Sequence, residues 1–418
     1  MDLGTLIGVA GLLVGVFAAV LAWAPQRIAS REESAALFEQ IRRHLKAHRL
    51  ELSAACTARQ SAHRVDGELP LLTRPGWIPD QPLDLDAVRM TLREARADEH
   101  LDAAREQLVP YWPRSSGTRL ESYCAAIEAL DRPTIWFNGP SYRLLEARTP
   151  REAGPDGPGT GLDLTFTLGH YFDGLDTTEA LGYEEALHQL RRGPEPLKGR
   201  YRRWLADPFV LNRRAALPGV NVLTVRAGDD GTYFFLHRRG TASVAVAMNT
   251  THVAPAGEFQ PHADVLPVWG TDLDLWRTIM REYAEEFLGV PDAAGSGGRI
   301  IDYSRDAPYA SFERARCDGA VRVRFLGLGL DPLTWKPEIC VLCVWDAAIF
   351  DRTFADMQQR NDEGVLVVGT RAEEGYRGIP FTADNVLGYA RHDQTLPAGR
   401  ACLTLAWRWR GELGLADA

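Results

Sequence analysis

Three glutamates that could share a metal ion, Glu282, Glu285 and Glu286, lie close together in the stretch RTIMREYAEEFLG at residues 277–289. Residues three and four positions apart lie on one face of an α-helix, so these carboxylates would project from nearly one patch. Clustered carboxylates repel one another unless a cation or arginines compensate them. Oxygen ligands of this kind suit Mg²⁺ or Mn²⁺, and a bound metal would in turn hold a diphosphate. The alternative is an amphipathic helix whose acidic residues are only solvated.

The elements around this stretch predict how the glutamates are positioned. A helix over residues 272–288 would bury an apolar face against a sheet, and the residues of that face are Leu275, Ile279, Tyr283 and Phe287. Upstream, the runs VNVLTVR and YFFLHRR flank the hairpin signal AGDDG at residues 227–231. Further strand-like runs are ASVAVAM, VRVRFLGLGL, ICVLCVW, GVLVVG and CLTLAWRW, and another helix is expected at about residues 347–360. Mixed strands with interspersed helices indicate an α/β or α+β sandwich.

The stretch from Arg281 to Glu286, REYAEE, resembles the R-E-U-x-E-E core of the Nudix box, where U is a bulky apolar residue. Upstream, VAPAGEFQP at residues 253–261 resembles the P-G-G loop that opens this box, with Gly257 in the place of its glycine. The strict box is not kept, because about ten extra residues, HADVLPVWGT, separate loop and helix. The box has a further glutamate upstream. Asp272 and Asp274 lie near its position in the sequence, but neither falls at that position. The glycine after the acidic pair, Gly289, falls one residue late.

A broader resemblance covers roughly Leu162 to Leu413. The segments VAPAGEFQP, DLWRTIMREYAEEFLG, IDYSRDAPYASFE, RNDEG and CLTLAWRWR together look like a Nudix-like module at the C-terminal end of certain bacterial helix-turn-helix regulators. The resemblance implies an αβα sandwich that recognises a nucleotide-diphosphate-type ligand. It implies ligand contacts at Gly257 and Glu258.

The resemblance also implies roles for the acidic helix. Glu282, Glu285 and Glu286 would hold Mg²⁺ or Mn²⁺. If the module is an enzyme, Glu285, Glu286 and Arg281 would be catalytic, with Arg281 orienting the acids while the metal activates water against a pyrophosphate bond.

A second group of candidates is basic. Arg226 and Arg238, with the neighbouring His237 and Arg239, could face a phosphate, because the guanidinium fork matches phosphate oxygens. The alternative is the basic edge of a strand.

The first residues predict an anchor in the membrane. Thr5–Ala24 is a run without a charged residue, about as long as a bilayer-spanning helix. A cleaved signal peptide is the competing interpretation, but no basic residues precede the run and Pro25 follows it. Basic residues after the run place the C-terminal part in the cytoplasm, as a single-pass protein of the inner or plasma membrane. Two Gly-x-x-x-Gly spacings in the run could allow homo-oligomers to form through this helix.

Four segments are therefore expected. They are a transmembrane anchor at residues 1–25, a mostly helical stalk or domain at 26–147, a Pro- and Gly-rich linker at 148–161 and the Nudix-like domain at 162–413. Within the second segment, helices are expected from Ser30 to about His63, from Leu83 to Leu108 and from Arg119 to Leu130.

Charge and cysteine content exclude some classes of function. A net charge of −9 argues against a dedicated nucleic-acid-binding protein. The pair Cys340 and Cys343 lies in a strand-like run, which would place the two thiols on opposite faces and so suits joint metal binding poorly. All six cysteines are expected to be reduced thiols in a reducing compartment.

These observations predict a membrane-anchored cytoplasmic sensor or effector that binds a nucleotide-type small molecule. An active Mg²⁺-dependent pyrophosphohydrolase of the Nudix type is one alternative, and a scaffold for protein interactions without a small ligand is another.

Overall fold

A computed structural model describes residues 32–415 apart from 116–117, 135, 150–160, 191–198, 240–249, 292–299, 358–359, 362–363, 368–370, 373–374 and 377. Its largest sheet has the strand order β1-β12-β13-β7-β8-β18, with β11 also paired to β7. The strands are β1 (Leu83–Asp84), β7 (Gly219–Gly228), β8 (Gly231–Phe234), β11 (Ala256–Glu258), β12 (Val321–Leu330), β13 (Pro337–Asp346) and β18 (Ile379–Pro380).

The parallel strands β7 and β13 form the centre of this sheet. Nearly all of their side chains are buried, as expected for strands that are covered on both faces. The predicted hairpin of β7 and β8 and the predicted strands β12 and β13 are confirmed. The mixed α/β content expected for the C-terminal part is therefore present.

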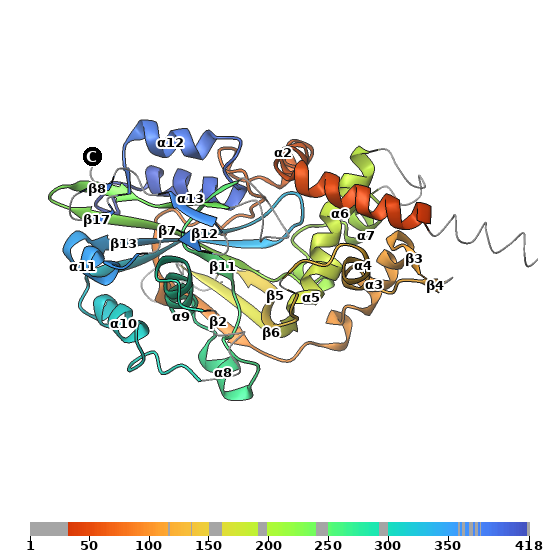
Figure 1. Cartoon of the computed structure of the whole chain (residues 1–418), viewed down its shortest axis with the longest axis horizontal. Helices are drawn as coiled ribbons and strands as arrows, with labels where there is room; N and C mark the ends of the chain where they lie inside the picture. The colour runs from red at the N-terminus through yellow and green to blue at the C-terminus, as the bar shows by residue number, and fades with distance from the viewer. Residues whose placement is uncertain are drawn as a thin grey trace, which may run out of the picture.

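Helices cover both faces of the main sheet (Figure 1). One face carries α9 (Leu275–Glu282), the π-helical turn η8 (Tyr283–Phe287), α10 (Tyr309–Cys317) and α11 (Ala347–Thr353). The other face carries α12 (Ala383–Arg391) and α13 (Pro397–Arg408). Cys343 belongs to the hydrophobic core under α9, and Cys340 belongs to the core under α13. The prediction that these two thiols point to opposite faces is confirmed.

Smaller sheets complete the fold. One has the order β10-β9-β15-β14, formed by β9 (Leu236–Arg239), β10 (Thr251–Val253), β14 (Arg360–Asn361) and β15 (Gly364–Val367). Another has the order β2-β6-β5, formed by β2 (Val88–Leu92), β5 (Pro140–Arg148) and β6 (Leu162–His170). Two-stranded pairs join β3 (Arg114–Ser115) to β4 (Thr118–Arg119) and β16 (Arg371–Ala372) to β17 (Gly375–Tyr376). The predicted strand ASVAVAM lies outside the described residues.

Helices dominate residues 32–205, together with the short strands of this stretch. Residues 32–47 are helical, and the chain continues through α2 (Arg49–Arg59), α3 (Asp102–Leu108), α4 (Tyr123–Leu130), α5 (Tyr171–Gly174), the π-helical turn η5 (Leu175–Glu179), α6 (Ala180–Gln189) and α7 (Arg200–Leu205). The long helix predicted over Leu83–Leu108 is wrong, because that stretch forms β1, β2 and only then α3. Buried residues of this part and of the α9 face belong to one continuous hydrophobic core.

The residues on the two sides of the predicted linker belong to one sheet. β5 ends at Arg148 and β6 begins at Leu162, and the two strands pair antiparallel from Pro140↔His170 to Arg148↔Asp163. The N-terminal part also extends the main sheet, since β1 pairs with β12 and Leu72 exchanges two backbone hydrogen bonds of 2.9 Å with Leu330.

The single-pass membrane architecture predicted from the sequence is contradicted. Among the residues that the structure describes, no helix is long and apolar enough to cross a membrane. The predicted segment, Thr5–Ala24, lies outside those residues. The membrane location, the cytoplasmic orientation of the C-terminal part and the oligomerisation through a transmembrane helix all depended on that anchor, so none of them is retained.

One partly buried ion pair next to β2 predicts how stability changes with pH. Arg93 donates through two nitrogens to Glu99, at 2.7 Å each, and the Arg96 N–H donates to the same carboxylate at 2.7 Å. The Arg93 hydrogen bonds lower the pKa of Glu99 to about 2. Because the folded-state pKa lies below the unfolded one, the stabilisation is present above about pH 4.5 and is lost as the pH falls towards 2.

Replacing Glu99 by glutamine is expected to lower the free energy of unfolding at pH 7 by roughly 2 kcal/mol and at pH 2 by much less. Urea unfolding at both pH values measures this difference. Glu94→Gln, at a neighbouring exposed acid, is the matched control and should change neither value. Equal losses at the two pH values would contradict the assignment.

Candidate functional site

The acidic helix and the Gly257 loop meet on the α9 face of the main sheet. The helix begins at Asp274, whose side chain accepts hydrogen bonds from the N–H groups of Trp276 (2.7 Å) and Arg277 (3.2 Å). It runs through α9 and continues as the π-helical turn η8, a rare local form that is often found at functional sites.

The apolar face of this helix is buried as predicted. Leu275, Ile279, Tyr283 and Phe287 are each at most 2 % exposed. The Tyr283 hydroxyl lies 2.8 Å from the Thr224 hydroxyl on β7 and accepts from Trp345 Nε1 on β13 at 3.1 Å. The helix is thereby fixed to the two central strands of the sheet.

The Gly257 loop closes directly against the acidic face. β11 pairs with the start of β7, and Gly257 faces Val220 there. A Cβ atom placed on Gly257 would lie only 2.0 Å from Glu282 Oε1, so a side chain at this position would require the Glu282 carboxylate to move away from the loop. Glu286 Oε1 accepts the Ala256 N–H at 3.0 Å. Two of the three predicted acids therefore contact the predicted loop.

The three acids differ in exposure. Glu286 is buried, at 4 % exposed, and its Oε2 lies 3.9 Å from His237 Nδ1 on β9. Glu282 and Glu285 are half-buried. In the described part of the chain, no three His, Cys, Asp or Glu side chains come together as a group that could hold a metal ion. Glu282 and Glu286 thus lie against the glycine loop and Glu285 is half-buried on the same helix, and the three carboxylates do not form a preformed metal site.

Arg281 lies in a buried cluster behind the loop. Its Nη1 donates to Asp272 Oδ2 at 3.0 Å and to the Tyr303 hydroxyl, and its Nη2 donates to the Gln260 carbonyl. Asp272 is fully buried; its Oδ2 also accepts the backbone N–H of His262 at 2.9 Å and lies 2.6 Å from His262 Nδ1. Arg281 thus ties the helix to the chain just after the loop.

The cluster keeps Asp272 ionised. Burial alone would raise the pKa of Asp272, but hydrogen bonds from His262 and the charge of Arg281 outweigh it and lower this pKa below its ordinary value. The pKa of Arg281 is raised in turn: burial opposes this shift, and the neighbouring Tyr303 and Asp272 more than offset it. The sequence alone gave Asp272 no role, because it does not fall at the position of the upstream glutamate in the box. Tyr303 was not predicted as part of the site.

The predicted basic residues are not gathered at the loop. Arg226 lies near the far end of β7, where it donates to Asp351 at 2.8 and 2.7 Å and to Asp230 at 2.9 Å. Hydrogen bonds to Asp351 are the main cause of its raised pKa. Arg238 is exposed on β9, next to the buried His237. Neither guanidinium contacts the acidic helix in any hydrogen bond or ion pair described.

Glu258, the other predicted ligand residue, lies at the end of β11. Its Oε1 accepts from the Ser141 hydroxyl at 2.7 Å, and its Oε2 lies 3.7 Å from Lys336 Nζ. Sequence reasoning missed both partners, because Ser141 and Lys336 are far from the loop in the chain and belong to no motif.

Comparison with known proteins adds no family to this description. No protein-family model matches the chain. No match was found among curated proteins either.

Proposed function

We propose that this protein binds a nucleotide-diphosphate-type ligand at the Gly257 loop and the acidic helix, as a sensor or effector, and that residues 162–413 form a Nudix-like module. The observation that carries the proposal is the contact of the Gly257 backbone with the Glu282 carboxylate. A glycine loop held against an acidic helix is the arrangement that the resemblance of the two segments implies. The bond from Ala256 N–H to Glu286 supports it further.

Mg²⁺ or Mn²⁺ belongs to this proposal as an ion that arrives with the ligand. Mg²⁺ usually binds proteins through one or two carboxylates together with substrate phosphates, and not in a cage of protein ligands alone. Glu282 and Glu285, which are half-buried, are the carboxylates that would take this part. Such an ion would offset the repulsion between a diphosphate and these acids.

Binding is favoured over hydrolysis because Glu286 and Arg281, to which the resemblance gives catalytic roles, already form hydrogen bonds within the fold. Glu286 is buried, and its Oε1 already accepts a backbone N–H. Arg281 is engaged with Asp272, Tyr303 and Gln260. Both side chains thus support the geometry of the loop.

The test is to titrate the full-length chain with nucleoside diphosphate derivatives in the presence of Mg²⁺, by calorimetry, and to assay the same mixtures for phosphate release. We expect saturable binding without turnover. Turnover that Glu285→Gln abolishes would instead support the hydrolase alternative, and neither binding nor turnover would leave the scaffold alternative.

Two substitutions connect the binding to this site. Glu282→Gln removes a carboxylate charge, and Gly257→Val places a side chain where that carboxylate lies. Each is expected to weaken binding by about tenfold or more, since a contact to a charged group is typically worth about 1.5–3 kcal/mol. Asp384→Asn, at an exposed acid in α12 on the opposite face of the sheet, is the control and should bind like the unmodified chain. Unchanged affinity in both site variants would contradict the location of the site.

A further inference from the structure

A pocket of about 370 Å³ lies where α2, α6 and α7 meet the loop between β12 and β13. Its lining includes five arginine and histidine side chains, which are Arg59, His63, His188, Arg202 and Arg203. They come from the end of α2 and the turn after it, from α6 and from α7, and Trp335 lines the pocket from the loop. The volume lies in the range of pockets that hold small molecules.

The acids of the lining do not balance these arginines. Two acids line the pocket, Glu184 and Glu185. Glu185 Oε1 lies 2.6 Å from Arg59 Nη2. Glu184 is buried, and its carboxylate accepts the N–H groups of Tyr201 at 2.7 Å and of Arg202 at 3.0 Å. Three arginines of the lining therefore face two carboxylates, and one of these carboxylates is already held inside the fold.

Two buried arginines behind the pocket increase this excess of positive charge. Arg214 is fully buried and donates to three backbone carbonyls at 2.8 to 3.2 Å. Arg143, which is also buried, donates to two further backbone carbonyls. Neither guanidinium bonds to a carboxylate in the part of the chain that the structure describes. Burial lowers the pKa of Arg214 to about 10, and the charges of Arg202 and Arg143 act in the same direction, but the side chain keeps its charge at pH 7.

Trp335 connects these buried arginines to the pocket. The guanidinium carbon of Arg202 lies 4.7 Å from the centroid of the Trp335 ring, and that of Arg214 lies 5.7 Å from it. Arg214 is therefore only one side chain away from the pocket. The two non-glycine residues with a positive φ in the described part of the chain, Ala206 (63°) and Trp335 (59°), both line this pocket. Such strained residues are concentrated at ligand-binding and catalytic sites.

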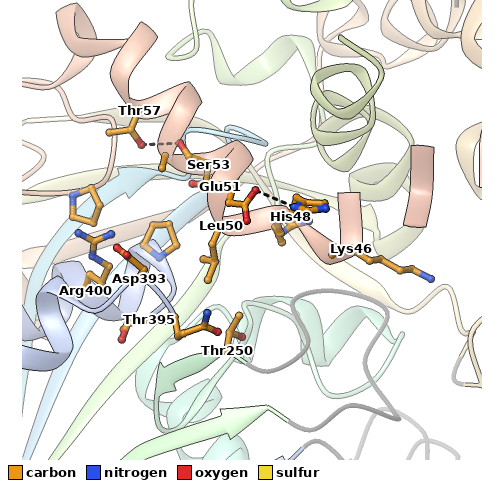
Figure 2. A pocket seen from close by; sticks show the side chains of 16 residues that line it. Lys46, His48, Leu50, Glu51, Ser53, Thr57, Thr250, Asp393, Thr395 and Arg400 are labelled. Atoms are coloured by element: carbon orange, nitrogen blue, oxygen red, sulfur yellow. Dashed lines mark hydrogen bonds and ion pairs between the residues drawn. The ribbon is translucent and has the colours of Figure 1, made fainter. Parts of the chain in front are cut away.

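A larger pocket, of about 490 Å³, does not share this charge. It lies between α2 and the start of α13 (Figure 2). Two acids, Glu51 and Asp393, line it together with Arg400. Its other cations, Lys46 and Arg49, form ion pairs with acids outside the lining. The larger pocket therefore has no excess of positive charge, and an anion should prefer the smaller one.

We propose that the smaller pocket binds a small organic anion through a phosphate or carboxylate group. Arg203 and Arg59 would bind the anionic oxygens, because the guanidinium fork matches both groups. The imidazole rings of His63 and His188 would lie against the body of the ligand. Arg202 and the buried Arg214 would add positive charge from behind, and a pocket of one sign of charge raises the local concentration of the opposite sign. No lining residue belongs to the Gly257 loop or the acidic helix, so the proposal does not rest on the function proposed there.

The test is to titrate the full-length chain, without Mg²⁺, with phenyl phosphate and with benzoate, and to use phenol as the neutral control. We expect at least one of the two anions to bind with a Kd below about 1 mM, and phenol to bind at least tenfold more weakly. The comparison of phenyl phosphate with benzoate shows which anionic group the pocket prefers. Raising the salt concentration from about 0.02 M to about 0.2 M should weaken the binding, because salt screens exposed charges.

Three results would overturn the proposal. One is the absence of saturable binding of either anion up to about 10 mM. Another is phenol binding as tightly as the anions. The third is an affinity that does not change with salt.

Variants locate the binding. Arg203→Gln is expected to weaken it by about tenfold, since a bond to a charged group is lost. Arg203 is exposed, so the thermal unfolding midpoint should stay close to that of the unmodified chain. Glu185→Gln should strengthen the binding by roughly threefold or more, because it keeps the shape of the side chain and removes a negative charge from the lining.

Arg400→Gln, in the larger pocket, is the matched control and should bind the anion like the unmodified chain. Weaker binding in Arg400→Gln but not in Arg203→Gln would place the anion in the larger pocket and overturn the assignment. Weaker binding in Glu185→Gln would contradict the role given to the charge of the smaller pocket.

Discussion

Replacing Asp272 by alanine is expected to lower the free energy of unfolding by about 3–5 kcal/mol, because it leaves the buried Arg281 guanidinium without its counter-ion. Asp272 is fully buried and bonds to Arg281, His262 and Tyr303. Since whole domains are stable by only about 5–15 kcal/mol, this single change should remove a large part of the total. Urea unfolding at pH 7 measures it.

A nearby aspartate provides the control. Asp274 caps α9 and is bonded only to backbone N–H groups in the hydrogen bonds described, so Asp274→Ala should cost about 1 kcal/mol. The contribution of Asp272 should also depend on pH. Because its folded-state pKa is lowered, the stabilisation is present above the unfolded value of about 4 and is lost as the pH falls below it. Similar losses for the two alanine variants at pH 7 would contradict the role given to the cluster.

Replacing Tyr283 by alanine is expected to cost a similar amount, about 3–5 kcal/mol, as large aromatic truncations in a core do. The Tyr283 ring is fully buried among Phe287, Trp345, Phe312 and Phe354, with ring centroids 5.1 to 6.0 Å away. The variant would leave a cavity between the acidic helix and the sheet. We expect it to weaken ligand binding as well, since Glu282 and Glu286 lie on the same helix.

Tyr283→Phe separates the ring from the hydroxyl. It keeps the aromatic contacts and removes the hydrogen bonds to Thr224 and Trp345, so about 1–3 kcal/mol should be lost. Thermal and urea unfolding of both variants give the comparison. A phenylalanine variant as unstable as the alanine variant would show that the hydroxyl, and not the ring packing, fixes the helix.

Part of this site could be predicted because its signals are local in the chain. The apolar face of α9 follows helical spacing, and its four predicted residues are buried. The contact between Gly257 and Glu282 joins the glycine loop and the acidic helix, the two segments that the resemblance to the Nudix box links. The contact between Asp272 and Arg281 could not be predicted. The inserted residues before Asp272 form a separate helix, α8 (Leu266–Thr271), and the spacing of a sequence motif does not show where such a helix places the residue that follows it.

Two segments were predicted with the wrong secondary structure, because their apolar residues were assigned the wrong periodicity. CLTLAWRW was interpreted as a strand, but Cys402, Leu405, Ala406 and Trp409 are buried at helical spacing in and just after α13. In the Leu83–Leu108 stretch, Val88 is buried and Met90 and Leu92 are half-buried, in alternation with the exposed Arg89 and Thr91, which is the pattern of a strand. The partners that make these elements fit, such as β6 beside β2, lie far away in the sequence.

The pairing of β5 with β6 has a consequence for how this protein can have arisen. A change of composition at residues 149–161 looks like a place where one ancestral gene fragment was joined to another. However, the two strands on its flanks pair along nearly their whole length, with one bulge between Leu144 and Glu146, and β1 and Leu72 add further pairs to the main sheet. A recombination event at that place would have separated each strand from its partner. We therefore expect the two halves to have been inherited together, with sequence changes on one side matched by changes on the other.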